Sequence, residues 1–522
     1  MHFTLGEMLS KSAIKYGHKT ALMDEDKQIN YKSLNERANC VANFLRAKGL
    51  KKGDRCAILL LNCCEYLELY FGMAKAGIIA VPINFRFTPT EIRHVLNDSE
   101  PSALVLGKDF NQFIPILKEH VPSVPIENYI CMEDPPDGAS LYEELITQAS
   151  SHPPGEEVAA EDVFFIAYTS GTTGIPKGAV VQHGNLLEHY LLMTREFGNL
   201  TENDTALLIM PLFHSNSTWL AQALIMIGGT VFIHPSRHFD PEYMLKLIAN
   251  HKITGVSVVP TMLTMLFELP EKTRNQYNIS SLHMITSSSA PILTKTKQQT
   301  IEFFKDIKIF EGYGSTETGV VTVLKPEDQL RKVRSVGEIS LLKSIKLLDD
   351  QYNEVPTGEV GELFVKGAGI LLHKYWRNPE QTNRAFWNDC WVTVGDMATV
   401  DDEGYFYLVD RKNDMIISGG ENIYPTEVEN VISNHPAVQE VAVIGVPDPK
   451  WSEKVHAVIV LREGKNCNEK EAREYCLDKI AKYKIPRSVE FVESIPKTLT
   501  GKILRREVRN MYGKVQEEEQ EV

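Results

Sequence analysis

The part of the sequence richest in groups that could do chemistry is the segment at 168–178, which reads YTSGTTGIPKG. Its glycines allow backbone conformations in which several N–H groups point toward one place. Hydroxyl side chains add further donors, and Lys177 adds a positive charge. Donors and a cation gathered in one short loop favour the binding of a polyphosphate. An ordinary surface turn is the alternative, and the length and density of the pattern argue against it.

This loop differs from the phosphate loop of the phosphoryl-transfer NTPases. In that loop the lysine is followed by Ser or Thr, whereas Gly178 follows Lys177 here. Apolar runs at 163–167 and 179–181 flank the loop. Since short apolar runs bounded by turn residues are typical of buried strands, we expect the loop to join two strands and to lack the helix N-terminus of the NTPase site.

Five further motifs follow in order along the chain. They read EGYGSTETG at 311–319, WVTVGD at 391–396, GYFYLVDR at 404–411, SGGENIYP at 418–425 and PKTLTGK at 496–502. Together with the glycine-rich loop they resemble the ordered motifs of the adenylate-forming (AMP-binding) superfamily, in its acyl-CoA synthetase or fatty-acid–CoA ligase branch. The resemblance covers nearly the whole chain, from about Tyr31 to Arg506.

The resemblance implies an ATP-dependent acid–thiol ligase. Such an enzyme joins a carboxylic acid to AMP and releases pyrophosphate, because the mixed anhydride is a better acylating agent than the free carboxylate. It then passes the acyl group to coenzyme A and releases AMP. ATP, Mg²⁺ and CoA are therefore the expected cofactors and co-substrates. The first step gathers negative charge on the phosphates, so it needs positioned N–H groups, a lysine and a hard divalent cation.

The resemblance also assigns site residues, position by position. For the nucleotide it implies Thr169, Ser170, Gly171, Thr172, Thr173, Gly174 and Lys177 at the β- and γ-phosphates, Thr316 at the α-phosphate, Tyr313 against adenine, Asp396 and Arg411 at the ribose, and Ser289, Ala290, Glu311, Gly312 and Gly314 around them. Glu317 is the implied magnesium ligand, together with the Thr169 hydroxyl. Lys502 is the implied catalytic lysine, which bridges the carboxylate and the α-phosphate.

The thiol and acid sites follow from the same resemblance. The C-terminal domain is expected to rotate after adenylation about a hinge at Asn413, where the family usually has Asp or Lys. Ser418, Gly419 and Gly420 would then line the tunnel for the pantetheine arm of CoA, since missing side chains leave room beside the backbone. His214 is the implied gate of the acyl pocket, and the nearby Ser217 and Trp219 are expected to shorten that pocket. These residues favour a linear or small cyclic apolar acid.

Hydrophobic periodicity indicates the elements that position these motifs. Leu34, Ala38, Val41 and Leu45 recur at helical spacing, and an apolar run at 56–60 follows. Repeated strand and helix patterns of this kind predict parallel sheets covered by helices on both faces. From about residue 333 to 407 short strands separated by turns predict a small β-rich unit.

The last hundred or so residues are predicted to form a separate α+β domain. Thr426 and Glu429 are spaced as a capping box for a helix, and strand-like runs follow at 441–446 and 457–461. The expected fold is therefore α/β: a large N-terminal domain of two αβ-layered sheets plus a small β-barrel-like unit, with a smaller mobile α+β C-terminal domain.

The predicted domains are residues 1–411, the adenylation core, and residues 412–522, which carry the catalytic lysine. The hinge is placed near residues 411–414, and an acidic tail is predicted at 514–522.

Composition limits the other functions of the chain. With 55 Lys and Arg against 69 Asp and Glu, its 522 residues carry a net charge of −14, which argues against a nucleic-acid-binding protein. No stretch reaches the roughly 18 apolar residues of a membrane span, and eight scattered cysteines predict reduced thiols. A cytoplasmic enzyme is expected, and a homodimer is compatible with it. Delivery of the acyl group to a carrier-protein thiol is the main alternative, followed by a luciferase-like oxidase and a non-catalytic nucleotide-binding scaffold.

Overall fold

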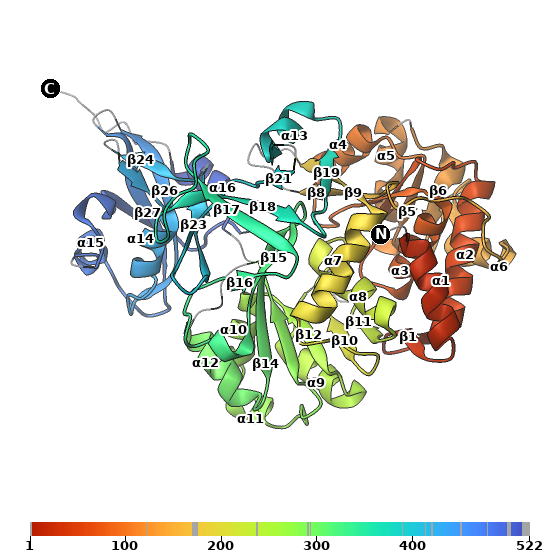
Figure 1. Cartoon of the computed structure of the whole chain (residues 1–522), viewed down its shortest axis with the longest axis horizontal. Helices are drawn as coiled ribbons and strands as arrows, with labels where there is room; N and C mark the ends of the chain where they lie inside the picture. Colours follow the sequence, from red (N-terminus) through yellow and green to blue (C-terminus); the bar gives the residue numbers. More distant parts are fainter. Residues whose placement is uncertain are drawn as a thin grey trace. The chain divides into compact units, whose positions relative to one another are not determined.

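The computed structural model describes most of the chain (Figure 1). The residues it describes are 3–121, 123–169, 176–235, 238–289, 292, 294–388, 390–412, 414–418, 421–448, 451–477, 479–497 and 503–513. The chain forms two compact units, one made of residues 1–344 and 365–392 and the other of residues 345–364 and 393–522. The domain boundary predicted after residue 411 rests on the hinge motif rather than on compactness, and it stays a prediction.

The first unit contains an eight-stranded sheet that carries the glycine-rich loop. In spatial order its strands are β19 (Leu372–Tyr375), β9 (Lys177–Gln182), β8 (Val163–Thr169), β4 (Ile79–Pro82), β3 (Arg55–Leu59), β5 (Ala103–Leu106), β6 (Tyr129–Cys131) and β7 (Ser140–Leu141). The strands from β8 to β7 are parallel, whereas β9 runs antiparallel to both of its neighbours. The two strands predicted on either side of the motif are therefore confirmed as β8 and β9, which pair as a hairpin.

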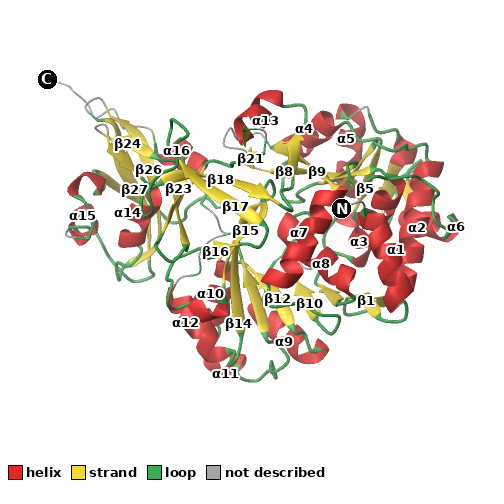
Figure 2. Ribbon diagram, in the orientation of Figure 1, coloured by secondary structure: helices red, strands yellow, loops and turns green. Residues whose placement is uncertain are grey.

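A nine-stranded sheet in the same unit carries the second motif (Figure 2). Its strands, in spatial order, are β16 (Glu338–Ile339), β15 (Gly319–Leu324), β14 (Lys308–Ser315), β13 (Met284–Ser287), β12 (Gly255–Val258), β10 (Thr205–Leu208), β11 (Thr230–Ile233), β1 (Thr20–Met23) and β2 (Gln28–Asn30). The strands from β14 to β1 are parallel, and β15 returns antiparallel to β14.

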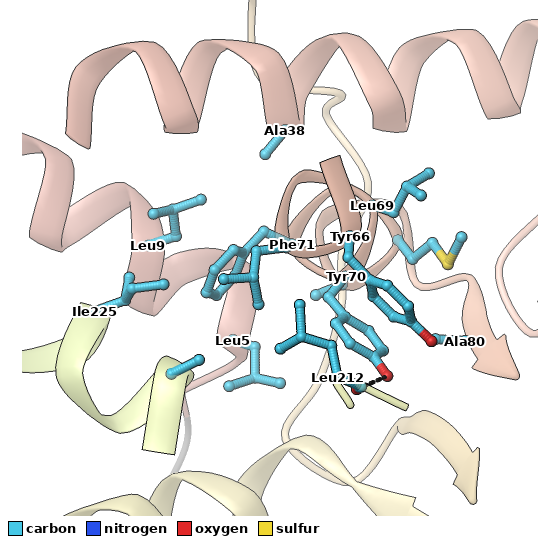
Figure 3. Packing of buried hydrophobic residues seen from close by; sticks show 14 of the residues in the cluster. Leu5, Leu9, Ala38, Tyr66, Leu69, Tyr70, Phe71, Ala80, Leu212 and Ile225 are labelled. Carbon is cyan, nitrogen blue, oxygen red and sulfur yellow. Dashed lines mark hydrogen bonds between the residues drawn. The ribbon is translucent and has the colours of Figure 1, made fainter. Parts of the chain in front are cut away.

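Helices share one apolar core with both sheets of the first unit. They are α1 (Leu5–Tyr16), α2 (Tyr31–Ala47), α3 (Cys64–Ala76), α7 (His183–Glu196) and α8 (Ser215–Ile227). Figure 3 shows side chains of α1, α2, α3 and α8 meeting in this core, where the Tyr70 hydroxyl donates to the Leu212 carbonyl oxygen at 3.3 Å. Leu34, Ala38, Val41 and Leu45 of α2 are fully buried here, as their spacing predicted.

Other helices cover the outer faces of the two sheets. Helices α4 (Pro89–Ser99) and α5 (Ile114–His120) pack on the eight-stranded sheet. Helices α9 (Pro241–His251), α10 (Pro260–Glu268) and α12 (Thr294–Phe303) pack on the nine-stranded sheet. The shorter helices of this unit are α6 (Tyr142–Gln148), α11 (Glu271–Arg274) and α13 (Pro379–Ala385). Both sheets thus have helices on both faces, and the predicted pair of αβ-layered sheets is confirmed.

The β-rich segment begins at β17 (Lys343–Leu348) and continues through β18 (Gly361–Gly367). In the first unit the end of β18 pairs with β21 (Trp391–Val392), which pairs in turn with β20 (Phe386–Trp387). In the second unit the start of β18 pairs with β22 (Asp396–Val400), and β22 pairs with β23 (Phe406–Arg411). The short strands predicted for this region are confirmed.

The rest of the second unit is an α+β fold, as predicted. Its sheet runs in the order β25 (Glu421–Ile423), β24 (Ile416–Ser418), β27 (Ser452–Leu461) and β26 (Val438–Asp448), with β28 (Ser488–Phe491) also beside β27. Helices α14 (Pro425–Ile432) and α15 (Glu469–Tyr475) belong to one apolar cluster on this sheet, and α16 (Arg505–Tyr512) belongs to a second cluster.

The capping box predicted from Thr426 and Glu429 is wrong. Helix α14 begins at Pro425, so Thr426 lies inside the first turn, and the side chain of the N-cap residue, Tyr424, makes no capping hydrogen bond. The Thr426 hydroxyl donates instead to the carbonyl oxygen of Val409. The Glu429 carboxylate accepts from the Val443 N–H at 2.8 Å and is likewise engaged away from the helix start. Proline suits the first helical position because it has no N–H to leave unpaired, and the helix starts two residues earlier than the capping box predicted.

Two further expectations from composition are tested by the structure. All eight cysteines are free thiols, and five of them are buried. In the described part of the chain, none of the helices has the length and apolar character that crossing a membrane would require.

Candidate active site

The glycine-rich loop opens between two residues that face each other across the β8–β9 hairpin. Thr169 and Lys177 are the last register pair before the loop. Each was predicted to contact the phosphates, and their pairing places both at the mouth of the loop. Residues 170–175 lie outside the described part of the chain. The roles predicted for Ser170, Gly171, Thr172, Thr173 and Gly174 therefore stay predictions.

The ammonium group of Lys177 has neighbours from a distant part of the chain. Its Nζ donates to Oε1 of Gln381 on α13 at 2.8 Å and lies 5.7 Å from the centre of the Tyr375 ring. Burial lowers the pKa of Lys177, while the negative charge of Glu317 acts in the opposite direction. A partly buried lysine beside a carboxylate keeps a localised positive charge, which suits it to a polyphosphate.

Glu317 lies in the turn between β14 and β15 and is 7% exposed. Its Oε1 accepts a hydrogen bond from the Tyr375 hydroxyl at 2.8 Å. Its carbonyl oxygen accepts from the N–H groups of Leu371 and Leu372 at 3.0 and 2.7 Å. Both the side chain and the backbone of Glu317 are thus held by the segment that leads into and forms β19.

The residues present fit a magnesium ion shared with a phosphate substrate. Among the described residues there is no cluster of three or more His, Cys, Asp or Glu side chains that would form an all-protein metal cage. Mg²⁺ is usually held by one or two carboxylates plus substrate phosphates and water. A single buried carboxylate, that of Glu317, close enough to Lys177 to influence its pKa, meets that description.

The Glu311–Gly319 motif brings two strands into unusually close contact. A Cβ atom on Gly314 would lie 2.0 Å from the Gly319 carbonyl oxygen, so only glycine fits there. The Glu311 carboxylate is 7% exposed, forms an ion pair with Lys297 on α12 and accepts the Ile292 N–H at 2.9 Å. Glu311 therefore ties β14 to the start of α12 through its side chain. Gly312 and Tyr313 lie on β14 between these two points.

Three segments meet where β13 and β14 end. The Ser215 hydroxyl, in the first turn of α8, lies 3.0 Å from the hydroxyl of Thr316. The next residue, Asn216, donates through Nδ2 to the Ser288 hydroxyl, which follows β13. In open α/β sheets, ligands bind at the carboxyl ends of the parallel strands. The position predicted for Thr316 is of this kind.

The neighbouring residues of the predicted adenine and acyl sites are placed as follows. Ser289 has a φ of 77°, an uncommon conformation for a residue with a side chain. Ala290 lies outside the described residues. His214 is exposed and forms the N-cap position of α8, with its ring centre 5.0 Å from that of Phe213. Its predicted role as a gate stays a prediction.

The two residues expected to shorten the acyl pocket are both buried. The Ser217 hydroxyl donates to the Met210 carbonyl oxygen at 3.0 Å, so it is engaged with the backbone just before the helix. The Trp219 ring stands edge to face against His189 of α7, with centres 4.5 Å apart. Their effect on the length of the bound acid stays a prediction.

The second unit carries the residues predicted for the ribose and CoA. Asp396 begins β22 and lies opposite Arg411 of β23 in the strand register, and their roles at the ribose stay predictions. The next residue, Lys412, forms ion pairs with Glu362 and Asp350, each at 2.9 Å. The segment after Arg411 is therefore tied to the β-rich part of this unit.

Ser418 ends β24 and is 5% exposed. Asn413, Gly419, Gly420 and Lys502 lie outside the described residues, so the hinge, the CoA tunnel and the catalytic lysine stay predictions.

The site contains contacts that sequence reasoning missed. Tyr375, Gln381 and Ser215 each touch a residue predicted to bind nucleotide or metal. Tyr375 and Gln381 lie about two hundred positions from Lys177, and no local pattern joins them to the glycine-rich loop. The only available signal was the turn and helix start around Asn378 and Pro379, which indicates a fixed loop but not its partner.

Comparison with known families accounts for this arrangement. The family described as AMP-binding enzyme matches residues 9–376, and its C-terminal domain family matches residues 427–502. The chain belongs to the AMP-binding enzyme family. Within that family it belongs to the acyl-CoA synthetase branch, as the order of its motifs predicted.

Two curated relatives are similar over nearly their full lengths. A feruloyl-CoA synthase of Amycolatopsis sp is 36% identical over 515 residues, which cover 98% of this chain and 99% of that protein. The long-chain-fatty-acid–CoA ligase FadD13 of Mycobacterium tuberculosis is 36% identical over 497 residues, covering 93% and 94%.

Solved structures show the same likeness. A fatty acyl CoA synthetase of Mycobacterium tuberculosis superposes with a TM-score of 0.80 at 33% identity and covers 98% of both chains. The ATP-bound MatB of Rhodopseudomonas palustris superposes with a TM-score of 0.88 at 30% identity, covering 98% of this chain and 100% of that one. The predicted fold class is confirmed by these neighbours.

Proposed function

We propose that this AMP-forming acyl-CoA synthetase activates an apolar monocarboxylic acid. ATP and the acid would give the acyl adenylate and pyrophosphate, and CoA would then take the acyl group and release AMP. The observation that carries the proposal is that Lys177 and Glu317 both contact Tyr375, one at its ring and the other at its hydroxyl. That arrangement offers one fixed cation and one fixed carboxylate to a polyphosphate and its metal ion.

Each residue has a distinct task in the first step. Lys177 and the loop beyond Thr169 would hold the outer phosphates, from which pyrophosphate departs. Thr316, whose hydroxyl is positioned by Ser215, would donate to the α-phosphate where the new bond forms. A magnesium ion at Glu317 would supply further positive charge against the leaving pyrophosphate. Because this charge develops in the transition state, fixed donors favour the reaction more than flexible ones.

The second unit carries the remaining proposed roles. Asp396 would accept hydrogen bonds from the ribose hydroxyls, with Arg411 opposite it on the next strand. Lys502 would bridge the acid and the α-phosphate during adenylation. Rotation about Asn413 would then bring Ser418, Gly419 and Gly420 to the thiol. The proposed boundary between the adenylation core and the rotating domain lies between residues 411 and 412.

The acid itself is proposed as a class. The two curated relatives are named for ferulate, an aryl acid, and for long-chain fatty acids. Both names describe a largely apolar body with one carboxylate, which agrees with the linear or small cyclic apolar acid favoured by His214, Ser217 and Trp219. A cytoplasmic location and a homodimer stay predictions. Delivery to a carrier protein is not favoured, because the curated relatives are named as CoA ligases or synthases.

The test is release of AMP and pyrophosphate across fatty, aryl and dicarboxylic acids, with and without CoA. The proposal expects one group of apolar monocarboxylates to give AMP, pyrophosphate and CoA thioester in equal amounts over many turnovers when CoA is present, and pyrophosphate from a single turnover when CoA is absent. Continued pyrophosphate release at the same rate with and without CoA, with no thioester formed, would favour the carrier-protein alternative. Preference for dicarboxylates would contradict the proposed acid class.

A further inference from the structure

We propose that Tyr375 is a positioning residue for adenylate formation, which holds the Glu317 carboxylate and the Lys177 ammonium group in one fixed arrangement. The inference rests on the proposed function, because it assigns Lys177 to the phosphates and Glu317 to magnesium. Tyr375 itself touches neither ligand in this account. It acts through the two charged side chains that do.

The local structure around Tyr375 leaves it little freedom. The residue ends β19, pairs with Ala179 of β9 in the strand register and is 9% exposed. Its N–H donates to the Thr382 hydroxyl at 2.9 Å, and the N–H of Trp376 donates to the Gly178 carbonyl oxygen at 2.7 Å. The backbone of Tyr375 is thus fastened to the strand that begins with Lys177.

The hydroxyl of Tyr375 fixes one oxygen of the Glu317 carboxylate. The hydrogen bond to Oε1 is 2.8 Å long and buried. A hydrogen bond to an ionised acceptor in a buried place is stronger than one between neutral groups, and it also sets the orientation of the carboxylate plane. The hydroxyl adds no charge of its own beside the carboxylate.

The ring of Tyr375 limits the position of Lys177. The ammonium group lies 5.7 Å from the ring centre, within the range of an attractive cation–π contact, and Gln381 holds it at 2.8 Å from a second direction. Lys177 and Glu317 carry opposite charges, and a direct pair between them would occupy the two groups that the phosphates and the metal require. Because Tyr375 contacts both side chains, it directs Lys177 toward the phosphates and Glu317 toward the metal ion.

Lys343 of β17 and the residues before Tyr375 also brace the backbone beside Glu317. Lys343 donates through Nζ to the carbonyl oxygens of Thr318 and Gly369 at 2.5 and 3.4 Å. Leu371 and Leu372 donate to the Glu317 carbonyl oxygen. Because the backbone is already fixed by these bonds, loss of the tyrosine hydroxyl alone should loosen the carboxylate without displacing the turn.

The experiment measures ATP binding to the full-length chain by calorimetry, in Mg²⁺ and in excess EDTA. Tyr375→Phe removes the hydroxyl and keeps the ring. We expect it to reduce the gain in ATP affinity caused by Mg²⁺ about tenfold, while affinity in EDTA stays within about twofold of the wild type. Tyr375→Leu removes the ring as well, so affinity in EDTA should also fall.

Tyr129→Phe is the matched control, since Tyr129 is fully buried in β6 and its hydroxyl has no hydrogen-bond partner. It should leave both affinities unchanged. The inference is overturned if Tyr375→Phe keeps the wild-type gain from Mg²⁺, or if it lowers affinity equally in Mg²⁺ and in EDTA. If the ATP affinity of the wild-type chain is the same in Mg²⁺ and in EDTA, the proposed function is overturned instead. Failure of the inference and failure of the proposed function are therefore distinguishable.

Discussion

The hydroxyl oxygens of Ser215 and Thr316 lie 3.0 Å apart and join the start of α8 to the motif that follows β14. Ser215 directly follows His214, the proposed gate of the acyl pocket, and Thr316 directly precedes Glu317. The acid side and the phosphate side of the proposed reaction therefore share one hydrogen bond. This contact gives the first mutational prediction.

Ser215→Ala should slow adenylate formation about threefold to tenfold, because Thr316 loses the partner that orients its hydroxyl. Thr316→Val should cost more, about a hundredfold, since it removes the proposed donor to the α-phosphate. Acid-dependent exchange of labelled pyrophosphate into ATP measures both. Equal effects of the two substitutions, or a larger effect of Ser215→Ala, would be inconsistent with the assignment of Thr316 to the phosphate.

Lys177→Met should lower kcat/KM for ATP by about a hundredfold, because it removes the fixed cation beside the outer phosphates. Gln381→Leu should produce a smaller loss, about tenfold, since it keeps the charge and removes only the hydrogen bond that holds it. KM for the acid should change little in both. Arg473→Leu is a suitable control, because this residue is exposed on α15 and pairs with Glu469. An effect on acid KM alone would place Lys177 elsewhere in the reaction.

Lys502→Ala tests the proposed division of labour between the two half-reactions. Adenylate formation should fall by several orders of magnitude, because the group that bridges the carboxylate and the α-phosphate is lost. Thioester formation from a supplied acyl adenylate and CoA should largely survive. The two rates are measured separately with the same preparation. Equal loss of the two rates would show that Lys502 is needed for folding or for the thiol step. It would contradict the assignment of Lys502 to adenylate formation alone.

His183 predicts a loss of stability in mild acid. It is fully buried, the Leu5 N–H donates to its Nδ1 at 3.4 Å, and burial lowers the pKa of the ring to about 4. An unfolded histidine has a pKa near 6.5. Between pH 6.5 and pH 4 the unfolded chain binds a proton at this histidine that the folded chain does not bind. The free energy of unfolding is therefore highest above pH 6.5 and falls as the pH approaches 4.

The expected loss attributable to His183 is on the order of 2 kcal/mol between pH 6.5 and pH 5. Asp162 and Lys52 also act on the ring, with opposite signs, so both are kept unchanged in the test. Urea unfolding of the wild type and His183→Asn at the two pH values measures the difference. The variant should lose less stability on acidification. Parallel losses in the two proteins would rule out this histidine as the cause.

Local motifs made much of the fold and site predictable. The β8–β9 hairpin follows from two apolar runs around a loop of glycine, serine and threonine, and the helix of Leu34 to Leu45 follows from its spacing. In both cases the signal lies within about twenty residues. Helix and strand periodicities also predicted that the sheets are covered on both faces, since buried parallel strands require it.

Contacts between distant segments were not predictable in the same way. The pairing of Tyr375 with Glu317 depends on β19 lying beside β9, which no local pattern indicates. The ion pair between Glu311 and Lys297 of α12 likewise joins segments that no local pattern connects, and the role of Glu311 in the nucleotide site stays a prediction. The capping box failed because Pro425 competes for the helix start, and a single residue changes which side chain can reach the free N–H groups.

The central claim is that the acid is joined to AMP before it reaches CoA. The most direct measurement supplies the acid with both carboxylate oxygens labelled with ¹⁸O, together with ATP, Mg²⁺ and CoA, and analyses the products by mass spectrometry. The account predicts one ¹⁸O atom in the phosphate of each AMP released and none in pyrophosphate. Unlabelled AMP, or label found in inorganic phosphate with formation of ADP, would contradict it.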